Sequence, residues 1–366
     1  MKRYRFVHFF LHNSQLFNCQ IQHFIRNNFS AEDHCFIYRY EENIPKELIQ
    51  DDNTKHDGTI GNPSKLSVYA SNADYIILHN LTYNYEDLIS VDSECLHKLI
   101  WIVWGGDLYR ISDKQSKIYL GLRNIYHFIN GYTRKKELAN HKIRQFAGIS
   151  ALFSGDRYYV LSKIGYNGKI LDAGYPLGYY NKDIDCWVKS KNDSKKTIMI
   201  GHSGFEYLNH IKYLEMLKKY KNEIKLLIPL NYGNEQYIEK IKKYLNKYYY
   251  DANVDVVLNK LPPDEYCSLL NGVDIAIIDC LQQSALGNIF VLLYLEKKVF
   301  LNKNGVLYTG FIKDGVKVYR TDSIRGMSMK ELLKKDDYTF NKQYASRILD
   351  EKETVKRWKV FFDNFK

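Results

Sequence analysis

The sequence predicts an α/β protein made of two doubly wound domains, each a parallel sheet with helices on its faces. Short apolar runs typical of buried strands alternate with longer stretches in which apolar residues recur at helical spacing. At 366 residues, the chain exceeds the size at which a single hydrophobic core usually stops growing. Polar and Gly-containing turns follow several of the apolar runs, as ligand-binding loops follow strands in such folds. We therefore expect two domains that face a cleft.

The first domain is expected to span residues 1–178. A helix is predicted over residues 16–28, because Leu16, Ile21, Phe24 and Ile25 recur at helical spacing. Further helices are predicted near residues 66–72 and 154–164, and residues 44–65 are polar enough for a surface connection. The predicted strands are residues 4–11, 34–40, 74–79, 99–104, 148–153 and 169–173.

A linker at 179–194 and a second domain at 195–340 are predicted next. The Gly and Pro residues of the stretch 174–185 are typical of an interdomain linker. Helices are predicted at 208–220, 235–248, from Pro262 onward and at 287–295. The predicted strands are residues 197–200, 223–230, 254–258, 274–278, 298–301, 306–311 and 316–319. A long terminal helix, 341–366, is expected to pack back on the first domain.

The stretch 274–295 joins a buried strand to an apolar helix through a polar hinge. The hinge contains Asp279, Gln282, Gln283 and Ser284. The carboxyl end of a parallel strand and the amino end of the next helix form the place where open α/β sheets bind ligands and where N–H groups attract anions. These residues are therefore candidates for ligand binding. The alternative is an ordinary polar loop with a helix cap.

Two further turns carry candidate site residues. Asp107 follows a buried strand and the glycines Gly105 and Gly106, so it is a candidate general base or acceptor for a sugar hydroxyl. The alternative is that Asp107 caps the next helix. Residues 201–204, Gly-His-Ser-Gly, form a tight turn that is able to present N–H groups and the Ser203 hydroxyl to a phosphate.

The charge balance restricts the class of partner. Lys and Arg outnumber Asp and Glu by 53 to 42, a net charge of +11, which favours nucleic acid, anionic lipid or a phosphorylated ligand. No aromatic-basic RNA-binding motif or paired-Cys zinc module occurs, so we expect no nucleic-acid partner. The basic and aromatic stretch 114–142 is suited to an anionic lipid surface or a polyprenyl diphosphate, although a solvated helical face is the more common use of such a pattern.

Cysteine spacing and hydropathy point to the cytoplasm. The six cysteines are scattered without paired spacing, which favours reduced thiols. No run of roughly 18 apolar residues occurs, so we expect peripheral attachment if the protein meets a membrane. No metal-ligand spacing, P-loop or Rossmann glycine fingerprint occurs, and no metal site is predicted.

Several motifs together resemble one bacterial family. They are WIVWGGDLY (101–109), IGHSG (200–204), LIPLNYGNEQYIEK (227–240), the Tyr266-x-x-Leu-Leu-x-x-x-Asp274 pattern and Gln282-Gln283 before Gly287. Their order and spacing over residues 95–305 resemble the TDP-Fuc4NAc:lipid II Fuc4NAc transferases, which are 4-alpha-L-fucosyltransferase-like enzymes. These add 4-acetamido-4,6-dideoxygalactose to a lipid-linked disaccharide during synthesis of enterobacterial common antigen.

The resemblance implies a GT-B glycosyltransferase with a dTDP- or UDP-sugar donor and a lipid-linked oligosaccharide acceptor. It implies no cofactor or metal, and a place at the anionic lipid on the cytoplasmic face of the inner membrane. The implied donor-binding residues are His202, Ser203, Gly204, Asn231, Gln282, Gln283 and Asn288. The implied acceptor-side residues are His12, Gly105 and Gly106, with Asp107 binding or deprotonating the acceptor hydroxyl.

Three departures from the family pattern leave the donor open. The family usually has Asn at position 202 and Ala at position 106, and some members have Arg where this chain has Leu281. The donor is therefore another dTDP- or UDP-linked amino or deoxy sugar if it is not Fuc4NAc, and the product an O-antigen or capsule unit. Two alternatives stay open: a nucleotide-sugar epimerase with the same architecture, and a non-catalytic scaffold that binds nucleotide or sugar at the membrane.

Overall fold

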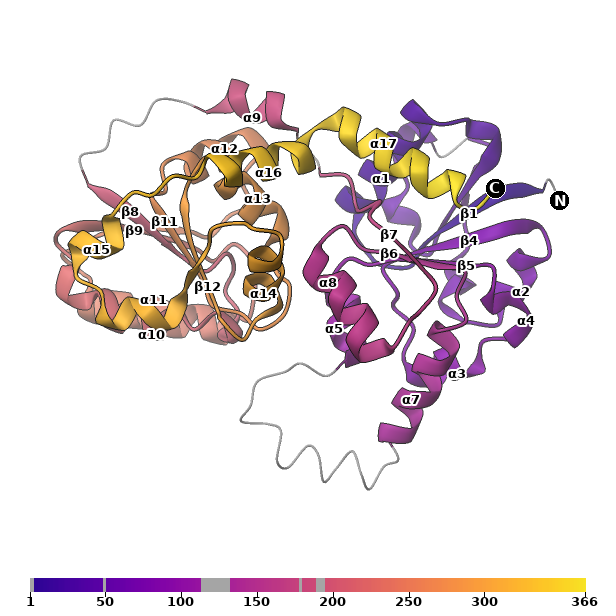
Figure 1. The fold of residues 1–366 in the computed structure, drawn as a ribbon, viewed down its shortest axis with the longest axis horizontal. Helices are drawn as coiled ribbons and strands as arrows, with labels where there is room; N and C mark the ends of the chain where they lie inside the picture. The colour runs from indigo at the N-terminus through magenta and orange to yellow at the C-terminus, as the bar shows by residue number, and fades with distance from the viewer. Residues whose placement is uncertain (1–2, 49–50, 113–131, 178–179, 189–194) are drawn as a thin grey trace. The chain divides into compact units, whose positions relative to one another are not determined.

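The computed structural model describes residues 3–48, 51–112, 132–177, 180–188 and 195–366. The chain forms two compact units, shown in Figure 1. Unit 1 consists of Met1–Gly178 and Lys352–Lys366, and unit 2 of Tyr179–Glu351. Each unit has its own parallel sheet and its own core, as the alternation of apolar runs and helical stretches predicts.

Unit 1 contains a seven-stranded parallel sheet in the order β3-β2-β1-β4-β5-β6-β7. From β1 the chain adds β2 and β3 on one side, then crosses to add β4 and the later strands on the other. The switch point of this sheet therefore lies between β1 and β4, whose carboxyl ends meet where Phe10 pairs with His79. The strands are β1 (Tyr4–Phe10), β2 (His34–Tyr38), β3 (Thr54–His56), β4 (Ala73–His79), β5 (Leu99–Ile102), β6 (Gly148–Ser150) and β7 (Lys169–Leu171).

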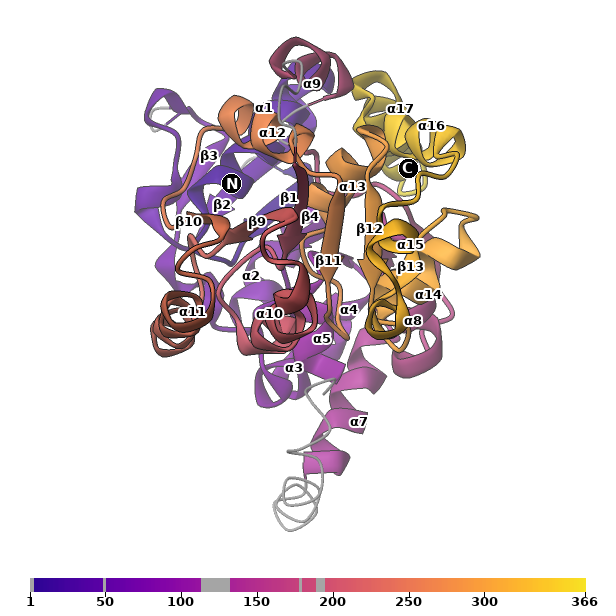
Figure 2. The same ribbon diagram turned by 90° about the vertical axis from the view of Figure 1, so that its left-hand side faces the viewer.

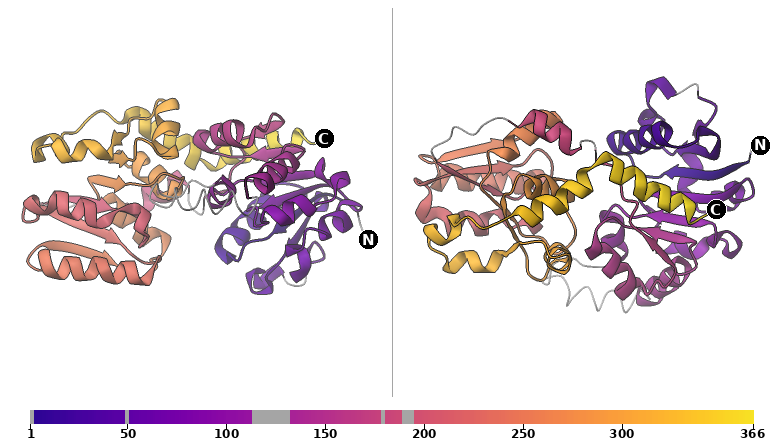
Figure 3. Two further views of the ribbon diagram at one scale, coloured as in Figure 1. Left: turned by 90° about the horizontal axis from the view of Figure 1, so that it is seen from below. Right: turned by 45° about the horizontal axis from the view of Figure 1, so that its top comes forward.

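Helices cover both faces of this sheet (Figure 3). On one face, α17 (Glu351–Asp363) packs Trp358, Phe361 and Phe362 against Phe6 and Phe10, and α1 (Gln15–Asn28) packs into the same core. Burial of these aromatic side chains ties the end of the chain to the first strand. The remaining helices of unit 1 are α2 (Lys65–Ala70), α3 (Tyr85–Ser90), α4 (Ser93–Leu96), α5 (Gly106–Ser112), α7 (Tyr132–Ile143) and α8 (Ser154–Tyr159).

Three buried imidazoles form a chain of hydrogen bonds across the sheet of unit 1. His8 Nδ1 lies 2.9 Å from His79 Nε2, and His8 Nε2 lies 2.9 Å from His34 Nδ1. Burial lowers the pKa of His34 to about 4 and that of His79 to about 3. The rings are therefore neutral at neutral pH, and the central ring, His8, donates through one nitrogen and accepts through the other.

Unit 2 contains a six-stranded parallel sheet in the order β10-β9-β8-β11-β12-β13, which Figure 2 shows from the side of this unit. Its switch point lies between β8 and β11 by the same reasoning. The strands are β8 (Lys196–Ile200), β9 (Ile224–Pro229), β10 (Asn253–Val257), β11 (Ile275–Ile278), β12 (Lys298–Leu301) and β13 (Tyr319–Arg320).

The helices of unit 2 also form two layers. One core lies between the sheet and α10 (His210–Leu217), α11 (Glu235–Tyr248) and α15 (Met329–Leu333). The apolar side chains of α11 in this core are Tyr237, Ile241 and Leu245, at the spacing of one helix face. The other helices are α9 (Asn181–Trp187), α12 (Pro263–Asn271), α13 (Leu286–Tyr294), α14 (Val306–Lys313) and α16 (Thr339–Leu349).

Five predictions about elements differ from the structure. Residues 306–311, expected to be a strand, form α14, and the strand expected at 316–319 is limited to Tyr319 and Arg320. The polar connection 44–65 contains the short edge strand β3. The predicted linker 179–194 contains α9, whose Asp185 accepts a 2.7 Å hydrogen bond from the Tyr294 hydroxyl. The single terminal helix 341–366 is two helices, because the chain at Asp350 has an extended backbone.

No helix in the described parts of the chain combines the length and the apolar character needed to cross a membrane. All six cysteines are present as free thiols.

Candidate functional site

Three loops meet at the carboxyl edge of the sheet of unit 2. They follow the adjacent strands β9, β8 and β11. Gly204 of the second loop pairs with Gly233 of the first, because the Gly204 N–H donates to the Tyr232 carbonyl at 2.7 Å and the Asn234 N–H donates to the Gly204 carbonyl at 3.0 Å. The predicted turn 201–204 and the turn at residues 231–233 are therefore one structure.

Glycine is required at two positions in these loops. Gly201 has φ +70°, and a Cβ built on it would lie 2.3 Å from His210 Nε2. Gly233 has φ +142°, and a Cβ there would lie 2.4 Å from the Gly204 carbonyl carbon. Any larger residue would strain the backbone and separate the two loops.

His202 joins the loops that follow β8, β9 and β11. It is buried, its Nδ1 lies 3.0 Å from the Tyr232 hydroxyl, and its Nε2 lies 2.8 Å from the Ser284 hydroxyl. Burial lowers the pKa of His202 to about 4, so the ring is neutral at neutral pH. A neutral ring donates through one nitrogen and accepts through the other, which satisfies both hydroxyls.

The predicted phosphate-binding turn is arranged differently from expectation. The Gly204 N–H, one of the expected phosphate donors, is used by the Tyr232 carbonyl. Both nitrogens of the His202 ring are used by the Tyr232 and Ser284 hydroxyls, so the ring has no nitrogen left for a phosphate. The Ser203 hydroxyl is buried and has no hydrogen-bond partner among the described residues. Asn231 lies half-buried beside Tyr232, so the structure brings it to the same edge.

Helix α13 begins at this edge without a side-chain cap. Its N-cap residue, Ala285, has φ +57°, in the left-handed region that L-residues other than Gly rarely adopt. The N–H groups of residues 286–288 have no intrahelical partner, because they belong to the first turn of a helix. Gln282 and Gln283 lie half-buried just before this turn. The N-terminus of α13 is therefore suited to an anion.

Asn288 is held by a neighbouring helix. Its Nδ2 donates to the Tyr266 hydroxyl of α12 at 3.0 Å. Its side-chain amide thus joins α13 to α12, a contact that sequence inspection does not reveal.

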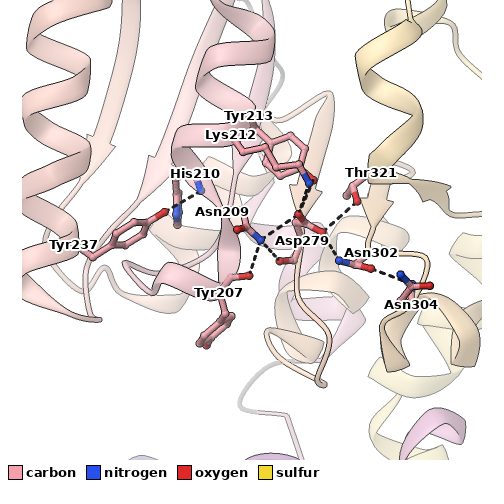
Figure 4. A network of polar contacts seen from close by, with 10 residues as sticks. All are labelled: Tyr207, Asn209, His210, Lys212, Tyr213, Tyr237, Asp279, Asn302, Asn304 and Thr321. Carbon is pink, nitrogen blue, oxygen red and sulfur yellow. Dashed lines mark hydrogen bonds and ion pairs between the residues drawn. The ribbon is translucent and has the colours of Figure 1, made fainter. Parts of the chain in front are cut away.

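Asp279 fixes the loops behind the site (Figure 4). It is the residue that follows β11, and only 1% of it is exposed. Its carboxylate accepts hydrogen bonds from five side chains in three segments: Tyr213 at 2.7 Å, Asn302 at 2.7 Å, Lys212 at 3.0 Å, and Asn209 and Thr321 at 3.2 Å each. Asp279 is therefore a positioning residue, and it has no oxygen exposed for a ligand.

Asp107 of unit 1 is likewise enclosed by its own chain. One carboxylate oxygen accepts from the N–H groups of Trp104 and Leu108, both at 3.0 Å. The other accepts from the Leu81 N–H at 3.0 Å and the Trp101 indole at 2.7 Å. Burial raises the pKa of Asp107, while these four donors oppose the rise. The four acceptor sites of the carboxylate are filled, so the geometry does not support a catalytic base. Asp107 lies within α5 and only one of its donors, Leu108, belongs to that helix, so it fixes the preceding turn and is not a helix N-cap.

The remaining acceptor-side residues lie at the carboxyl edge of the sheet of unit 1. His12 is exposed in the loop after β1. Gly105 has φ +97°, which allows the chain to turn from β5 into α5, and a Cβ on Gly106 would meet no atom within 4 Å. His12 and Trp104 are in contact, with ring centroids 5.9 Å apart.

Two predictions concern other parts of the surface. Of the basic stretch 114–142, residues 114–131 lie outside the described residues, and the described Lys135 forms an ion pair with Glu86 at 2.8 Å. Among the described residues, no three His, Cys, Asp or Glu side chains converge as a metal site would require. Metal independence stays a prediction.

Comparison with known proteins identifies a family that matches most of the chain. The family described as 4-alpha-L-fucosyltransferase glycosyl transferase group 56 matches residues 88–336. This match covers the end of α3, α4, the strands β5 to β7 and nearly all of unit 2.

Solved structures align with almost the whole chain. A glycosyltransferase from Rickettsia africae has a TM-score of 0.65 at 12% identity and covers 100% of both chains. HepE from Anabaena, in complex with UDP and glucose, has a TM-score of 0.62 at 11% identity and covers 99% of this chain and 100% of that one. A putative UDP-N-acetylglucosamine 2-epimerase from Listeria monocytogenes has a TM-score of 0.56 at 11% identity, over 99% and 96%. At such identities the likeness establishes the GT-B fold and nothing finer.

Proposed function

This chain belongs to the 4-alpha-L-fucosyltransferase family, glycosyl transferase group 56, and from that premise we propose the substrates on which it acts. The proposed donor is a dTDP- or UDP-linked deoxy-amino sugar, Fuc4NAc or a close relative. The proposed acceptor is a polyprenyl-diphosphate-linked glycan of a bacterial surface polysaccharide, of the enterobacterial common antigen or O-antigen type. The family membership supports the transfer of a deoxy sugar, and the motifs of residues 95–305 support the finer assignment.

The observation that carries the donor assignment is the convergence of three loops at the switch point of unit 2. The uncapped start of α13 adds N–H groups with a favourable helix dipole. Ser284 and His202 hold that start against the turn after β8. A diphosphate is the ligand that such a surface suits, and UDP is the nucleotide in the HepE complex.

The proposed chemistry follows from the charge that develops on the leaving nucleoside diphosphate. As the glycosidic bond breaks, negative charge grows on the phosphate oxygens, and N–H donors directed at that position lower the barrier. The N–H groups of residues 286–288, the side chains of Gln282 and Gln283, and the Ser203 hydroxyl are the proposed donors. His202, neutral and hydrogen-bonded on both sides, acts by positioning Ser284 and Tyr232.

The test is thermal stabilisation by dTDP, UDP, GDP and CMP, each with a divalent metal and with a chelator. A ligand at about 100 times its Kd stabilises the folded state by roughly 2.7 kcal/mol. Stabilisation by dTDP or UDP with the chelator present is the expected result. A chain that none of the four nucleotides stabilises would lose the donor assignment, and the scaffold alternative would replace it.

A matched pair of variants makes this test specific. Gln283→Ala should weaken nucleotide binding by about threefold to tenfold, the net value of one typical hydrogen bond. Gln236→Ala, an exposed glutamine in the first turn of α11, should leave it unchanged. Equal binding by both variants would remove Gln283 from the site.

Product analysis with UDP-N-acetylglucosamine alone separates transfer from epimerisation, because an epimerase needs no acceptor.

We also propose that the protein works at the cytoplasmic face of the inner membrane, since its acceptor is lipid-linked. The net charge of +11 supports attraction to anionic lipid. Sedimentation with phosphatidylglycerol vesicles and with phosphatidylcholine vesicles tests this. Binding to the anionic vesicles that falls with added salt is expected, and equal binding to both would contradict it.

A further inference from the structure

Three aromatic side chains from separate segments of unit 1 are in mutual contact at the carboxyl edge of its sheet. Phe17 comes from the first turn of α1, Trp104 follows β5, and Tyr175 follows β7. Ring centroids are 5.4 Å apart for Phe17 and Trp104, 4.7 Å for Phe17 and Tyr175, and 5.2 Å for Trp104 and Tyr175. We call these three residues the aromatic platform.

The platform is partly open to solvent and rigidly held. Phe17 is 40% exposed, and Trp104 and Tyr175 are half-buried. The Tyr175 hydroxyl donates to Gln20 Oε1 at 3.0 Å, and the backbone N–H of Trp104 donates to the Asp107 carboxylate at 3.0 Å. Such anchoring holds large apolar surfaces in place before a ligand arrives, which reduces the entropy that binding costs.

Buried polar atoms without partners lie at the same edge. The Trp104 indole Nε1, the Thr82 hydroxyl and His79 Nδ1 are each enclosed and make no hydrogen bond with the described residues. His79 is the last residue of β4 and is completely buried, and Thr82 lies in the loop that follows it. Each unmet polar atom costs about 1–3 kcal/mol. The three atoms belong to the ends of the neighbouring strands β4 and β5 and to the loops after them, where a polar ligand would supply the missing partners.

We infer that the aromatic platform binds a pyranose ring of the acceptor glycan. A sugar ring has an apolar C–H face that suits aromatic side chains, and hydroxyls around its rim that suit an indole N–H and a threonine hydroxyl. A polyprenyl chain fits less well, because it has no group to satisfy those polar atoms. This inference rests on the proposed function, since it places the sugar acceptor on unit 1. Asp107, which accepts the backbone N–H of Trp104, is then a positioning residue for the platform.

Saturation-transfer NMR with methyl glycosides of glucose, galactose, N-acetylglucosamine and N-acetylmannosamine tests the platform. We expect ring C–H protons of at least one glycoside to receive saturation. Phe17→Leu, which keeps an apolar side chain but removes the ring, should weaken that binding by about fivefold or more, as loss of an aromatic anchor does. Trp104→Phe, which keeps a ring but removes the N–H, should weaken it less.

Controls separate failure of the platform from failure of the donor assignment. Leu138→Ala truncates an exposed side chain of α7 in the same unit and should leave glycoside binding unchanged. Stabilisation by UDP or dTDP is measured on the same samples and should be equal in all variants. The inference is overturned if no glycoside binds at millimolar concentration while a nucleotide does, if Phe17→Leu binds as the parent protein does, or if farnesyl diphosphate displaces the bound glycoside. Loss of nucleotide stabilisation in the parent protein would overturn the proposed function instead.

Discussion

The Ser284 hydroxyl lies 2.8 Å from the Nε2 atom of His202, and this contact joins the loop after β11 to the loop after β8. These two strands are neighbours in the sheet but are far apart in the sequence. Because the switch point lies between them, the contact fixes the width of the edge at which α13 begins.

Removal of this contact should weaken donor binding more than it weakens the fold. We expect Ser284→Ala to raise the Kd for UDP or dTDP by about threefold to tenfold, the value of one neutral hydrogen bond, with little change in Tm. Ser323→Ala, which removes a hydroxyl bonded only to the Arg320 carbonyl of its own turn, is the control. Calorimetric titration with nucleotide is the measurement. Unchanged affinity in Ser284→Ala would show that the contact does not shape the site.

Asp107→Asn should destabilise the protein. An amide presents its own N–H₂ group where the carboxylate accepts two donors, so at least one buried N–H loses its acceptor, at a cost of about 1–3 kcal/mol. Asp92→Asn, at the exposed N-cap of α4, should cost almost nothing, because Asn and Asp cap helices equally well. Urea unfolding measures both variants. A catalytic Asp107 would instead give full loss of transfer at unchanged stability.

The strands of the two sheets show what the sequence predicts and what it does not. Apolar runs such as residues 275–278 and 298–301 locate strands well, because a buried parallel strand needs little else. The same signal fails at Val306–Lys313, where a short apolar run forms a helix, and at β3, an edge strand with two exposed residues. Order along the chain also predicts that the loops after β8, β9 and β11 carry the site.

The sequence does not predict the hydrogen-bond partners of the buried side chains. The four donors to Asp107 come from residues 81, 101, 104 and 108, and the donors to Asp279 come from segments up to 70 residues away. Nothing in a turn such as Gly-Gly-Asp distinguishes a carboxylate that faces a ligand from one that its own backbone encloses. Tyr232 lies in the motif of residues 227–240, but nothing in that motif indicates that its hydroxyl contacts His202.

Acid should destabilise the protein well above the pH at which carboxylates protonate. Burial lowers the pKa of His34 and His202 to about 4 and of His79 and His210 to about 3, and it lowers the pKa of His8 well below its usual range. In the unfolded chain these imidazoles protonate near pH 6.5, whereas the folded chain keeps them neutral. Stability is therefore complete above about pH 6.5 and falls as the pH drops toward 4.

The expected slope is up to about 1.4 kcal/mol per pH unit for each such histidine. Urea unfolding at several pH values between about 7.5 and 5 measures it. His97→Gln, which removes an exposed imidazole, should follow the curve of the parent protein. A free energy of unfolding that stays level over this range would contradict the neutral, buried state of the five rings.

Asp156 should show the opposite dependence. It is buried in the first turn of α8, where the Tyr109 hydroxyl donates to it at 2.5 Å. Burial raises the pKa of Asp156 to about 7. In the unfolded chain an aspartate ionises near pH 3.9, so this group favours folding below that pH, and its contribution is lost as the pH rises through about 7.

Asp156→Asn should therefore stabilise the protein at high pH. The amide resembles the protonated acid in shape and still accepts from Tyr109, and it has no charge to bury. We expect a gain of about 1 kcal/mol or more at pH 8 and none near pH 4, measured by urea unfolding of both proteins. Asp264→Asn, in the exposed first turn of α12, is the matched control and should give no gain at pH 8, because an acidic residue at that position favours the helix. An Asp156→Asn variant that is less stable than the parent at pH 8 would mean that Asp156 is ionised in the folded protein and that its charge is stabilised there.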